Sequence, residues 1–198
     1  MIKLKKDEER NFRSMMRIIT GSARGTKLFT LEGENTRPTA ERVKEAIFSM
    51  IQFEVEGRAV LDLFAGSGQM ALEALSRGAA EAVLVDSSRD AVGIIKKNIE
   101  KTRLGESCEV FCADYAEALS RMRGRRKFDI VFLDPPYRLG ATAPALKLLR
   151  KYELLKPTSI IVCESGDDEF LSSVSELYDV VKSAKYGVAN VTILKVKE

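Results

Sequence analysis

The chain has 198 residues, of which 45% are hydrophobic and 31% are charged, and its formal net charge is +3. These values are typical of one globular domain with a core of its own, and no apolar run approaches the ~18 residues that a membrane helix needs. The sequence contains no histidine, which excludes Ser-His-Asp and Cys-His catalysis as well as histidine metal sites.

The three cysteines, Cys108, Cys112 and Cys163, include no Cys-x-x-Cys pair. A sparse and odd number of cysteines fits the reducing cytoplasm, which is where we expect the protein. Cys108 and Cys112 lie four residues apart in a predicted strand, so their side chains point to one face and we interpret them as core residues. No third or fourth ligand accompanies them, and no metal site is expected.

The N-terminal part of the chain predicts a small appendage over residues 16–56. Residues 1–15 are highly charged without an apolar period, and we interpret them as an upstream extension or added residues. The stretches MRIITG and TKLFTL, within residues 16–31, predict a β-hairpin. Apolar side chains then recur at three- and four-residue spacing from Val43 to Ile51, which predicts an amphipathic helix.

Residues 57–198 show short apolar runs that alternate with helical patterns, and we expect them to form the main, catalytic domain. Strands are predicted at AVLDLF, EAVLVD, CEVFCA, FDIVFL and SIIVCE, and helices at residues 69–77, 89–103, 114–122, 142–152 and 168–176. Two last strands, near residues 178–184 and 190–196, have no helix between them. This order predicts an α/β fold with a doubly wound, mostly parallel seven-stranded sheet that ends in an antiparallel β-hairpin.

A glycine-rich loop follows the first strand of this sheet. Gly66, Gly68 and Ala71 match the loose dinucleotide pattern G-x-G-x-x-A, and Asp86 lies eighteen residues after Gly68. A nicotinamide-dependent oxidoreductase is therefore one interpretation. Asp62 argues against it, because a carboxylate at the mouth of the loop would repel a pyrophosphate and attract the ammonium group of S-adenosylmethionine.

A second motif, DPPY at residues 134–137, follows the fourth strand. An exocyclic base amine is a poor nucleophile because its lone pair is delocalised, and two acceptors aimed at its hydrogens would make the nitrogen more tetrahedral. The Asp134 carboxylate and the Pro135 carbonyl are two such acceptors, on a corner that Pro136 stiffens. Tyr137 offers a ring on which an unstacked base can lie.

Asp114 and Glu164 end two further strands at the same edge of the predicted sheet, where open α/β sheets bind their ligands. Asp114 is expected near the adenine of a cofactor or near the target base, or alternatively as the N-cap of the following helix. Glu164 is open to both a ligand contact and a structural role.

These motifs together resemble a known family. The stretches MRIITGSARGTKL, RPTAERVKEAIFSMI, VLDLFAGSGQMALEALSRGA, LDPPY and VCES are similar to those of class I S-adenosylmethionine-dependent methyltransferases, and most closely to the bacterial 16S ribosomal RNA guanine-N2-methyltransferases of the RsmD type, over residues 16–198. The resemblance implies methylation of the exocyclic N2 amine of a guanine in 16S ribosomal RNA, within the small subunit or an assembly intermediate. We expect a cytoplasmic monomer that uses S-adenosylmethionine and no metal.

The resemblance also implies functional residues. The catalytic residues would be Asp134, Pro135, Pro136 and Tyr137. The cofactor-binding residues would be Asp62, Phe64, Ala65, Gly66, Ser67, Gly68, Asp86 and Asp114. Gln69 and Met70 depart from the smaller residues that the family usually has after the second glycine.

Cations of the N-terminal appendage are the predicted RNA-binding residues. They are Arg17, Arg24, Lys27, Arg37 and Arg42, and Lys44 belongs to the same basic group. A denser run, RMRGRRK at residues 121–127, precedes the fourth strand and is therefore expected at the opposite edge of the sheet from DPPY. We interpret this run as a solvated loop.

Three alternative functions remain at this point. An adenine-N6 methyltransferase acting on DNA or RNA would share DPPY, although a DNA enzyme usually carries a target-reading domain for which this chain has no room. A NAD-binding oxidoreductase would share the glycine loop. A non-catalytic RNA-binding protein would not need an intact DPPY motif.

Overall fold

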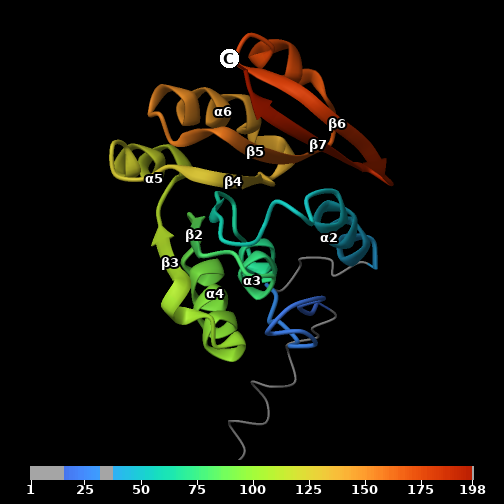
Figure 1. The fold of residues 1–198 in the computed structure, drawn as a ribbon, viewed down its shortest axis with the longest axis vertical. Helices are drawn as coiled ribbons and strands as arrows, with labels where there is room; N and C mark the ends of the chain where they lie inside the picture. Colours follow the sequence, from blue (N-terminus) through green and yellow to red (C-terminus); the bar gives the residue numbers. More distant parts are fainter. Residues whose placement is uncertain (1–15, 32–37, 198) are drawn as a thin grey trace, which may run out of the picture.

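A seven-stranded sheet organises the computed structural model, which describes residues 16–31 and 38–197 (Figure 1). The strand order is β3-β2-β1-β4-β5-β7-β6. Strands β1 to β5 pair in parallel, whereas β7 runs antiparallel to both β5 and β6. The strands are β1 (Ala59–Asp62), β2 (Glu81–Asp86), β3 (Cys108–Cys112), β4 (Phe128–Leu133), β5 (Leu155–Ser165), β6 (Tyr178–Tyr186) and β7 (Ala189–Val196).

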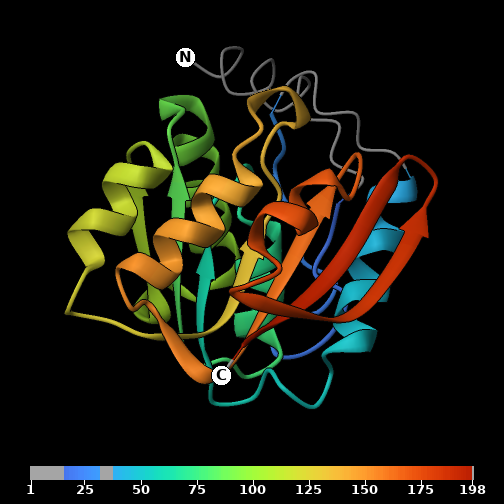
Figure 2. The same cartoon turned by 90° about the horizontal axis from the view of Figure 1, so that it is seen from above.

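Helices cover both faces of this sheet (Figure 2). One face packs against α2 (Pro38–Met50), α3 (Gln69–Ser76) and α4 (Arg89–Thr102). The other face packs against α5 (Tyr115–Met122), α6 (Thr142–Lys151) and the 3-10 helix η3 (Glu169–Val174). Two short 3-10 helices, η1 (Gly105–Ser107) and η2 (Tyr137–Leu139), lie in connecting loops. The predicted doubly wound sheet with its C-terminal antiparallel hairpin is therefore confirmed.

The last predicted helix, residues 168–176, is an exception because it forms the 3-10 helix η3 instead. Its serine hydroxyls donate to backbone carbonyls three residues earlier, as from Ser172 to Glu169 and from Ser173 to Phe170. Serine side chains that bond to the local backbone compete with the regular hydrogen bonds of an α-helix. The apolar spacing alone did not reveal this competition.

The prediction that Cys108 and Cys112 are core residues is wrong for Cys112, which is exposed, and Cys108 is only half-buried. Both lie in β3, the edge strand of the sheet, which pairs on one side only. Cys163, in the more central strand β5, is buried. Position within the sheet, rather than periodicity along the strand, decides the burial of these thiols.

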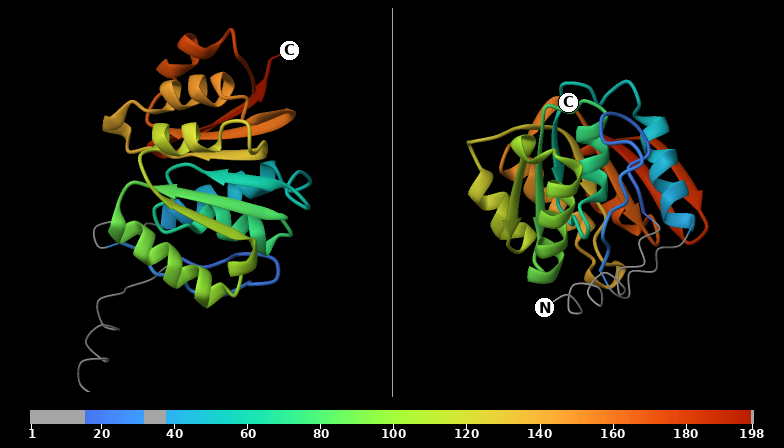
Figure 3. Two further views of the ribbon diagram at one scale, coloured as in Figure 1. Left: turned by 90° about the vertical axis from the view of Figure 1, so that its left-hand side faces the viewer. Right: turned by 90° about the horizontal axis from the view of Figure 1, so that it is seen from below.

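The N-terminal segment, residues 16–31, crosses α3 and α4 (Figure 3). The predicted hairpin is reduced to a single antiparallel bridge between Arg17 and Lys27. Backbone N–H groups that would extend a hairpin are used elsewhere, since those of Ile19 and Thr20 donate to the buried Glu73 carboxylate on α3 at 2.7 and 3.0 Å. The segment is therefore held by side chains of the main domain more than by its own strand pairing.

Lys44 does not belong to the exposed basic group in which the sequence placed it, because only 2% of its surface is exposed. Its Nζ donates to the Arg17 carbonyl at 2.6 Å and lies 3.5 Å from the Glu73 carboxylate. A buried charge needs such partners, and Glu73 supplies the opposite charge. Lys44 thus joins α2, α3 and the N-terminal segment.

Candidate active site

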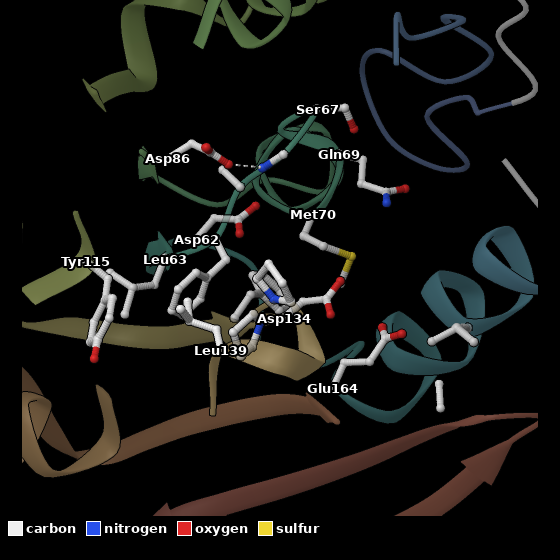
Figure 4. A pocket seen from close by; sticks show the side chains of 18 of the residues that line it. Asp62, Leu63, Ser67, Gln69, Met70, Asp86, Tyr115, Asp134, Leu139 and Glu164 are labelled. Atoms are coloured by element: carbon white, nitrogen blue, oxygen red, sulfur yellow. Dashed lines mark hydrogen bonds between the residues drawn. The ribbon is translucent and has the colours of Figure 1, made fainter. Parts of the chain in front are cut away.

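A cavity of about 840 Å³ opens at the edge of the sheet where the parallel strands end (Figure 4). Residues at or just beyond the ends of five strands line it. The turn between β6 and β7, at Gly187 and Val188, contributes a further wall. The acidic side chains that the structure brings together here are Asp62, Asp86, Asp114, Asp134 and Glu164.

The charged side chains among the described residues that line this cavity are all acidic. Its described lining contains five carboxylates, whereas no lysine or arginine is among the described residues that line it. In a partly desolvated cavity such a set of charges strongly favours a cationic ligand over an anionic one. Among the described residues, no group of three or more potential ligands is arranged to hold a metal ion.

The glycine loop forms the tight entry to α3. Gly66 and Gly68 have φ angles of 53° and 79°, in the left-handed region that side chains other than glycine rarely adopt. The Gly68 N–H donates to the Ala65 carbonyl at 2.6 Å. A Cβ on Gly68 would lie 3.0 Å from the Leu84 side chain, so the close packing of the loop on β2 also requires glycine.

Asp86 fixes this loop from the end of β2. Its carboxylate accepts the Gly66 N–H at 2.9 Å and the Ser88 N–H at 2.8 Å, one on each oxygen. Each carboxylate oxygen has two lone pairs, so both can accept a further hydrogen bond. The half-buried Asp86 can therefore bind ligand hydroxyls and hold the loop at the same time.

Asp62, at the end of β1, is a buried acid, with 3% of its surface exposed. Burial raises its pKa from 3.8 to about 7; the Ala71 N–H, which donates to it at 3.2 Å, opposes this rise, and the negative charge of Asp86 adds to it. The chain provides no cation to compensate this carboxylate among the residues that the structure describes. A ligand cation would do so.

Asn98 is a positioning residue that the sequence analysis missed. Its fully buried amide donates to the Ser67 carbonyl at 2.8 Å and to the Phe29 carbonyl at 2.9 Å, and its oxygen accepts the Phe29 N–H at 2.7 Å. It therefore joins the glycine loop to the N-terminal segment. A signal was present, since Asn98 continues the apolar stripe of Ile94 and Ile95 on α4.

Tyr115 is a further lining residue that the sequence analysis missed. Its ring pairs with that of Phe64, a predicted cofactor-binding residue, with centroids 5.4 Å apart, next to Asp114. Asp114 also caps α5 by accepting the Ala116 N–H at 2.8 Å, which confirms the N-cap alternative, and its contact with a ligand stays a prediction. Gln69 lines the cavity too, and its amide oxygen is buried without a hydrogen-bond partner among the described residues.

The DPPY corner follows β4 and leads into η2. Asp134, Pro135 and Pro136 all line the cavity. The Pro136 carbonyl accepts the Leu139 N–H at 2.8 Å, which closes the turn behind the corner. The side chain of Tyr137 lies outside the described part of the chain, so the predicted stacking on its ring stays a prediction.

Only part of the predicted RNA-binding group lies next to this cavity. Arg17 and Arg42 are each adjacent in sequence to a lining residue, Met16 and Val43 respectively. All the described cations of this group other than Lys44 are exposed, and Arg17 forms an ion pair with Glu41 at 2.9 Å. Lys27 is bridged to Arg17, whereas Arg24 lies in the turn that packs on Ser76, at the end of α3 away from the cavity. Arg37 lies outside the described residues.

The basic run at residues 121–127 precedes β4 and lies at the amino edge of the sheet, as the sequence predicted. Arg121 pairs with Glu117, and Arg126 pairs with Glu109. Part of this charge is therefore already neutralised within the chain. No residue of the run is among the described residues that line the cavity.

Comparison with known proteins identifies the family. The model of the family described as "Conserved hypothetical protein 95" matches residues 16–195. The chain is 33% identical over 188 residues to a ribosomal RNA small subunit methyltransferase D of Haemophilus influenzae, and the match covers 94% of this chain and 97% of that relative. The chain belongs to this family.

Solved structures support the same assignment. A structure from Escherichia coli, described as a candidate methyltransferase, superposes on this family member with a TM-score of 0.81 and 30% identity, over 92% of this chain and 98% of that chain. A candidate methyltransferase solved in complex with S-adenosylhomocysteine has a TM-score of 0.71 at 14% identity, over 86% of this chain and 53% of that chain, and shows the fold alone. The predicted class I methyltransferase fold is thus confirmed.

Proposed function

We propose that this family member is an S-adenosylmethionine-dependent methyltransferase that modifies the exocyclic N2 amine of a guanine in 16S ribosomal RNA. The assignment of the cofactor rests on the negative charge of the side chains that line the cavity. A nicotinamide dinucleotide would bring a pyrophosphate against five carboxylates, with no arginine or lysine among the described lining residues. S-adenosylmethionine instead carries an ammonium and a sulfonium, and it has no phosphate.

The residues of the cavity fit this cofactor. Asp62 would pair with the ammonium group, which compensates its buried charge, and Asp86 would accept the ribose hydroxyls. The glycine loop allows close approach of the backbone, and the ring pair of Phe64 and Tyr115 offers an apolar surface beside Asp114 for the adenine. The buried oxygen of Gln69 is an acceptor that the ammonium group can satisfy.

S-adenosylmethionine, when bound, supplies a methyl group on a positively charged sulfur. The protein would position the target base and supply acceptors for the hydrogens of its amine. Asp134 and the Pro135 carbonyl would accept the two hydrogens of the target amine and draw its lone pair out of the ring. Preorganised acceptors of this kind need no reorganisation during the reaction, which is how they lower its barrier.

Two observations support ribosomal RNA as the substrate. Relatives in the family are named as methyltransferases of small-subunit ribosomal RNA. Arg17 and Arg42 are exposed and are each adjacent in sequence to a residue that lines the cavity, and RNA phosphates are attracted to such cations. We place the reaction in the cytoplasm, on the small subunit or an assembly intermediate, with a monomeric enzyme.

Transfer of tritiated methyl groups tests this proposal. Naked 16S RNA, small subunits, large subunits and double-stranded DNA would be compared, and the labelled nucleoside would be identified by mass spectrometry. We expect labelling of small subunits or 16S RNA and the recovery of N2-methylguanosine. Recovery of N6-methyladenosine, or labelling of DNA alone, would replace this function with the adenine-N6 alternative.

A further inference from the structure

Glu164 lies next to the catalytic corner in space although thirty positions separate it from Asp134 in the sequence. Strands β4 and β5 pair in parallel, and Leu133 is opposite Cys163. Asp134 and Glu164 each follow one residue after this pair, on neighbouring strands. Both line the same cavity, and Figure 4 shows both carboxylates directed into it.

The surroundings leave the Glu164 carboxylate available to a ligand. It accepts no hydrogen bond and forms no ion pair with the residues that the structure describes. The neighbouring Ser165 hydroxyl is already used, because it donates to the Asp167 carbonyl at 2.5 Å. Glu164 also borders a second cavity behind Pro135 and Pro136, and no lysine or arginine is among the described residues that line either cavity.

Apolar side chains surround this end of the cavity. Leu139 and Val188 line it and are unusually exposed for large hydrophobic residues, at 56% and 71%. Tyr186, at the end of β6, completes this wall. A flipped base would cover these side chains and remove water from Glu164. Burial already raises the pKa of Glu164, and a carboxylate left unpaired beneath a base would be strongly disfavoured.

The carboxylates of Asp134 and Glu164 are two neighbouring acceptors, which suit a base edge that carries two neighbouring donors. The Watson–Crick edge of guanine presents the N1 hydrogen directly beside the N2 amine, so it offers donors at both positions. Adenine presents the N1 lone pair beside its amine, and a carboxylate facing that lone pair would be repelled. An adenine with its amine at Asp134 would therefore place its N1 lone pair against the Glu164 carboxylate, and these two acceptors would repel each other.

We propose that Glu164 determines base specificity by accepting the N1 hydrogen of the target guanine while Asp134 binds the N2 amine. This inference rests on the proposed function and adds a residue that selects the base. Glu164 contacts the substrate without touching the transferred methyl group. Its loss should consequently change the preference among bases more than the binding of S-adenosylmethionine.

The base 2,6-diaminopurine separates the two roles, because it keeps the 2-amine of guanine and lacks the N1 hydrogen. The methylated guanosine is first located in 16S RNA by mass spectrometry. RNAs that carry guanine, 2,6-diaminopurine or adenine at that position are then prepared by ligation of synthetic fragments and assembled into small subunits. The values of kcat/KM would be measured for the wild type, Glu164→Gln, Glu164→Ala and the control Glu176→Gln, which changes an exposed glutamate outside the cavity.

The wild type and Glu176→Gln should prefer guanine over 2,6-diaminopurine by ~10- to 100-fold, the usual consequence of losing a hydrogen bond to a charged group. Glu164→Gln should lose activity on guanine and narrow this preference to within a few-fold, because its amide N–H can donate to the bare N1 atom. Glu164→Ala should narrow it too, because the repelling charge is gone. Affinity for S-adenosylmethionine should stay unchanged in every variant.

An unchanged preference in both folded Glu164 variants, with guanine still methylated by the wild type, would overturn this inference and leave the proposed function intact. A wild type that methylates no guanosine in 16S RNA would instead overturn the proposed function itself. If only one variant folds, the other still decides the result, since both are expected to narrow the same ratio.

Discussion

Asp62 and Asp129 are two nearly buried aspartates at opposite edges of the same sheet, with 3% and 5% of their surface exposed. Asp62 ends β1 at the carboxyl edge, and Asp129 lies at the start of β4 at the amino edge. Each accepts a backbone N–H, from Ala71 and from Ala59 respectively. In secondary structure and burial the two residues are therefore closely matched.

Their partners differ. Asp129 pairs with Lys156 at 2.6 Å and with Arg58 at 3.2 Å. Burial acts to raise the pKa of Asp129, but the hydrogen bonds from Lys156 and Ala59 outweigh it and the pKa is lowered. Asp62 has no such cation among the described residues, and its pKa rises to about 7. The charges at Asp129 are thus balanced within the chain, whereas Asp62 would need a cationic ligand to balance its charge.

The largest expected effect comes from the chemical step at the carboxyl edge. Asp134→Ala should reduce single-turnover methyl transfer on the order of 10²–10³-fold, because one preorganised acceptor is lost. Asp134→Asn should be milder, since an amide oxygen still accepts a hydrogen bond. The measurement is single-turnover transfer at saturating S-adenosylmethionine, with cofactor affinity measured in parallel.

The amino edge supplies the control. Asp129→Asn should lower the melting temperature, because Lys156 and Arg58 lose their charged partner, and should leave turnover per folded molecule unchanged. Full activity in Asp134→Ala, or a large loss of turnover in folded Asp129→Asn, would contradict the assignment of chemistry to the carboxyl edge.

The second effect concerns cofactor binding. Asp86→Ala should weaken S-adenosylmethionine binding by ~10- to 100-fold, because hydrogen bonds to a charged acceptor are lost along with its support of the glycine loop. Asp90→Ala, four residues further on in the first turn of α4, is the matched control and should bind normally. Calorimetry on both variants checks this, and equal affinities would remove Asp86 from the cofactor site.

The smallest effect concerns RNA affinity. Removing the charges of Lys27 and Arg42 together should weaken binding to small subunits several-fold, and should reduce the slope of log affinity against log salt concentration by up to about two. The paired control, Arg125→Ala with Lys127→Ala, removes two exposed charges at the amino edge and should change little. A larger loss in that control would place the RNA on the opposite edge.

The sequence predicted those parts of the molecule that follow from chain order. Alternating strands and helices placed Asp86, Asp134 and Glu164 at one edge, because all parallel strands end on the same side of a sheet. Two features depended on packing between distant elements instead. Lys44 can be buried because Glu73, on another helix, supplies the opposite charge. The predicted hairpin is not extended because side chains of α3 and α4 accept hydrogen bonds from its backbone N–H groups.

The exposure of Cys112 is a third feature that the sequence did not predict, because the spacing of Cys108 and Cys112 does not show that β3 is an edge strand.

The role of Asn98 could be predicted only in part. A polar residue on an apolar helix stripe is visible in the sequence, but its partners in the glycine loop and the N-terminal segment appear only in the fold. Local patterns therefore located the candidate site, and tertiary contacts explain how it is held.

The pH dependence of S-adenosylmethionine binding tests most directly whether the carboxyl edge is completed by a cation. In the free protein Asp62 holds a proton below pH 7, and it must lose this proton to pair with the ammonium group. Affinity should therefore rise by up to ~10-fold per pH unit as the pH approaches 7, with proton uptake by the buffer, and fall again once the ammonium group deprotonates near ~8. Calorimetry in buffers of different ionisation enthalpy measures both quantities. Asp62→Asn should abolish the rise and keep the fall. An affinity that does not change between pH 5.5 and about 7, or tight binding of NAD in place of S-adenosylmethionine, would contradict this account.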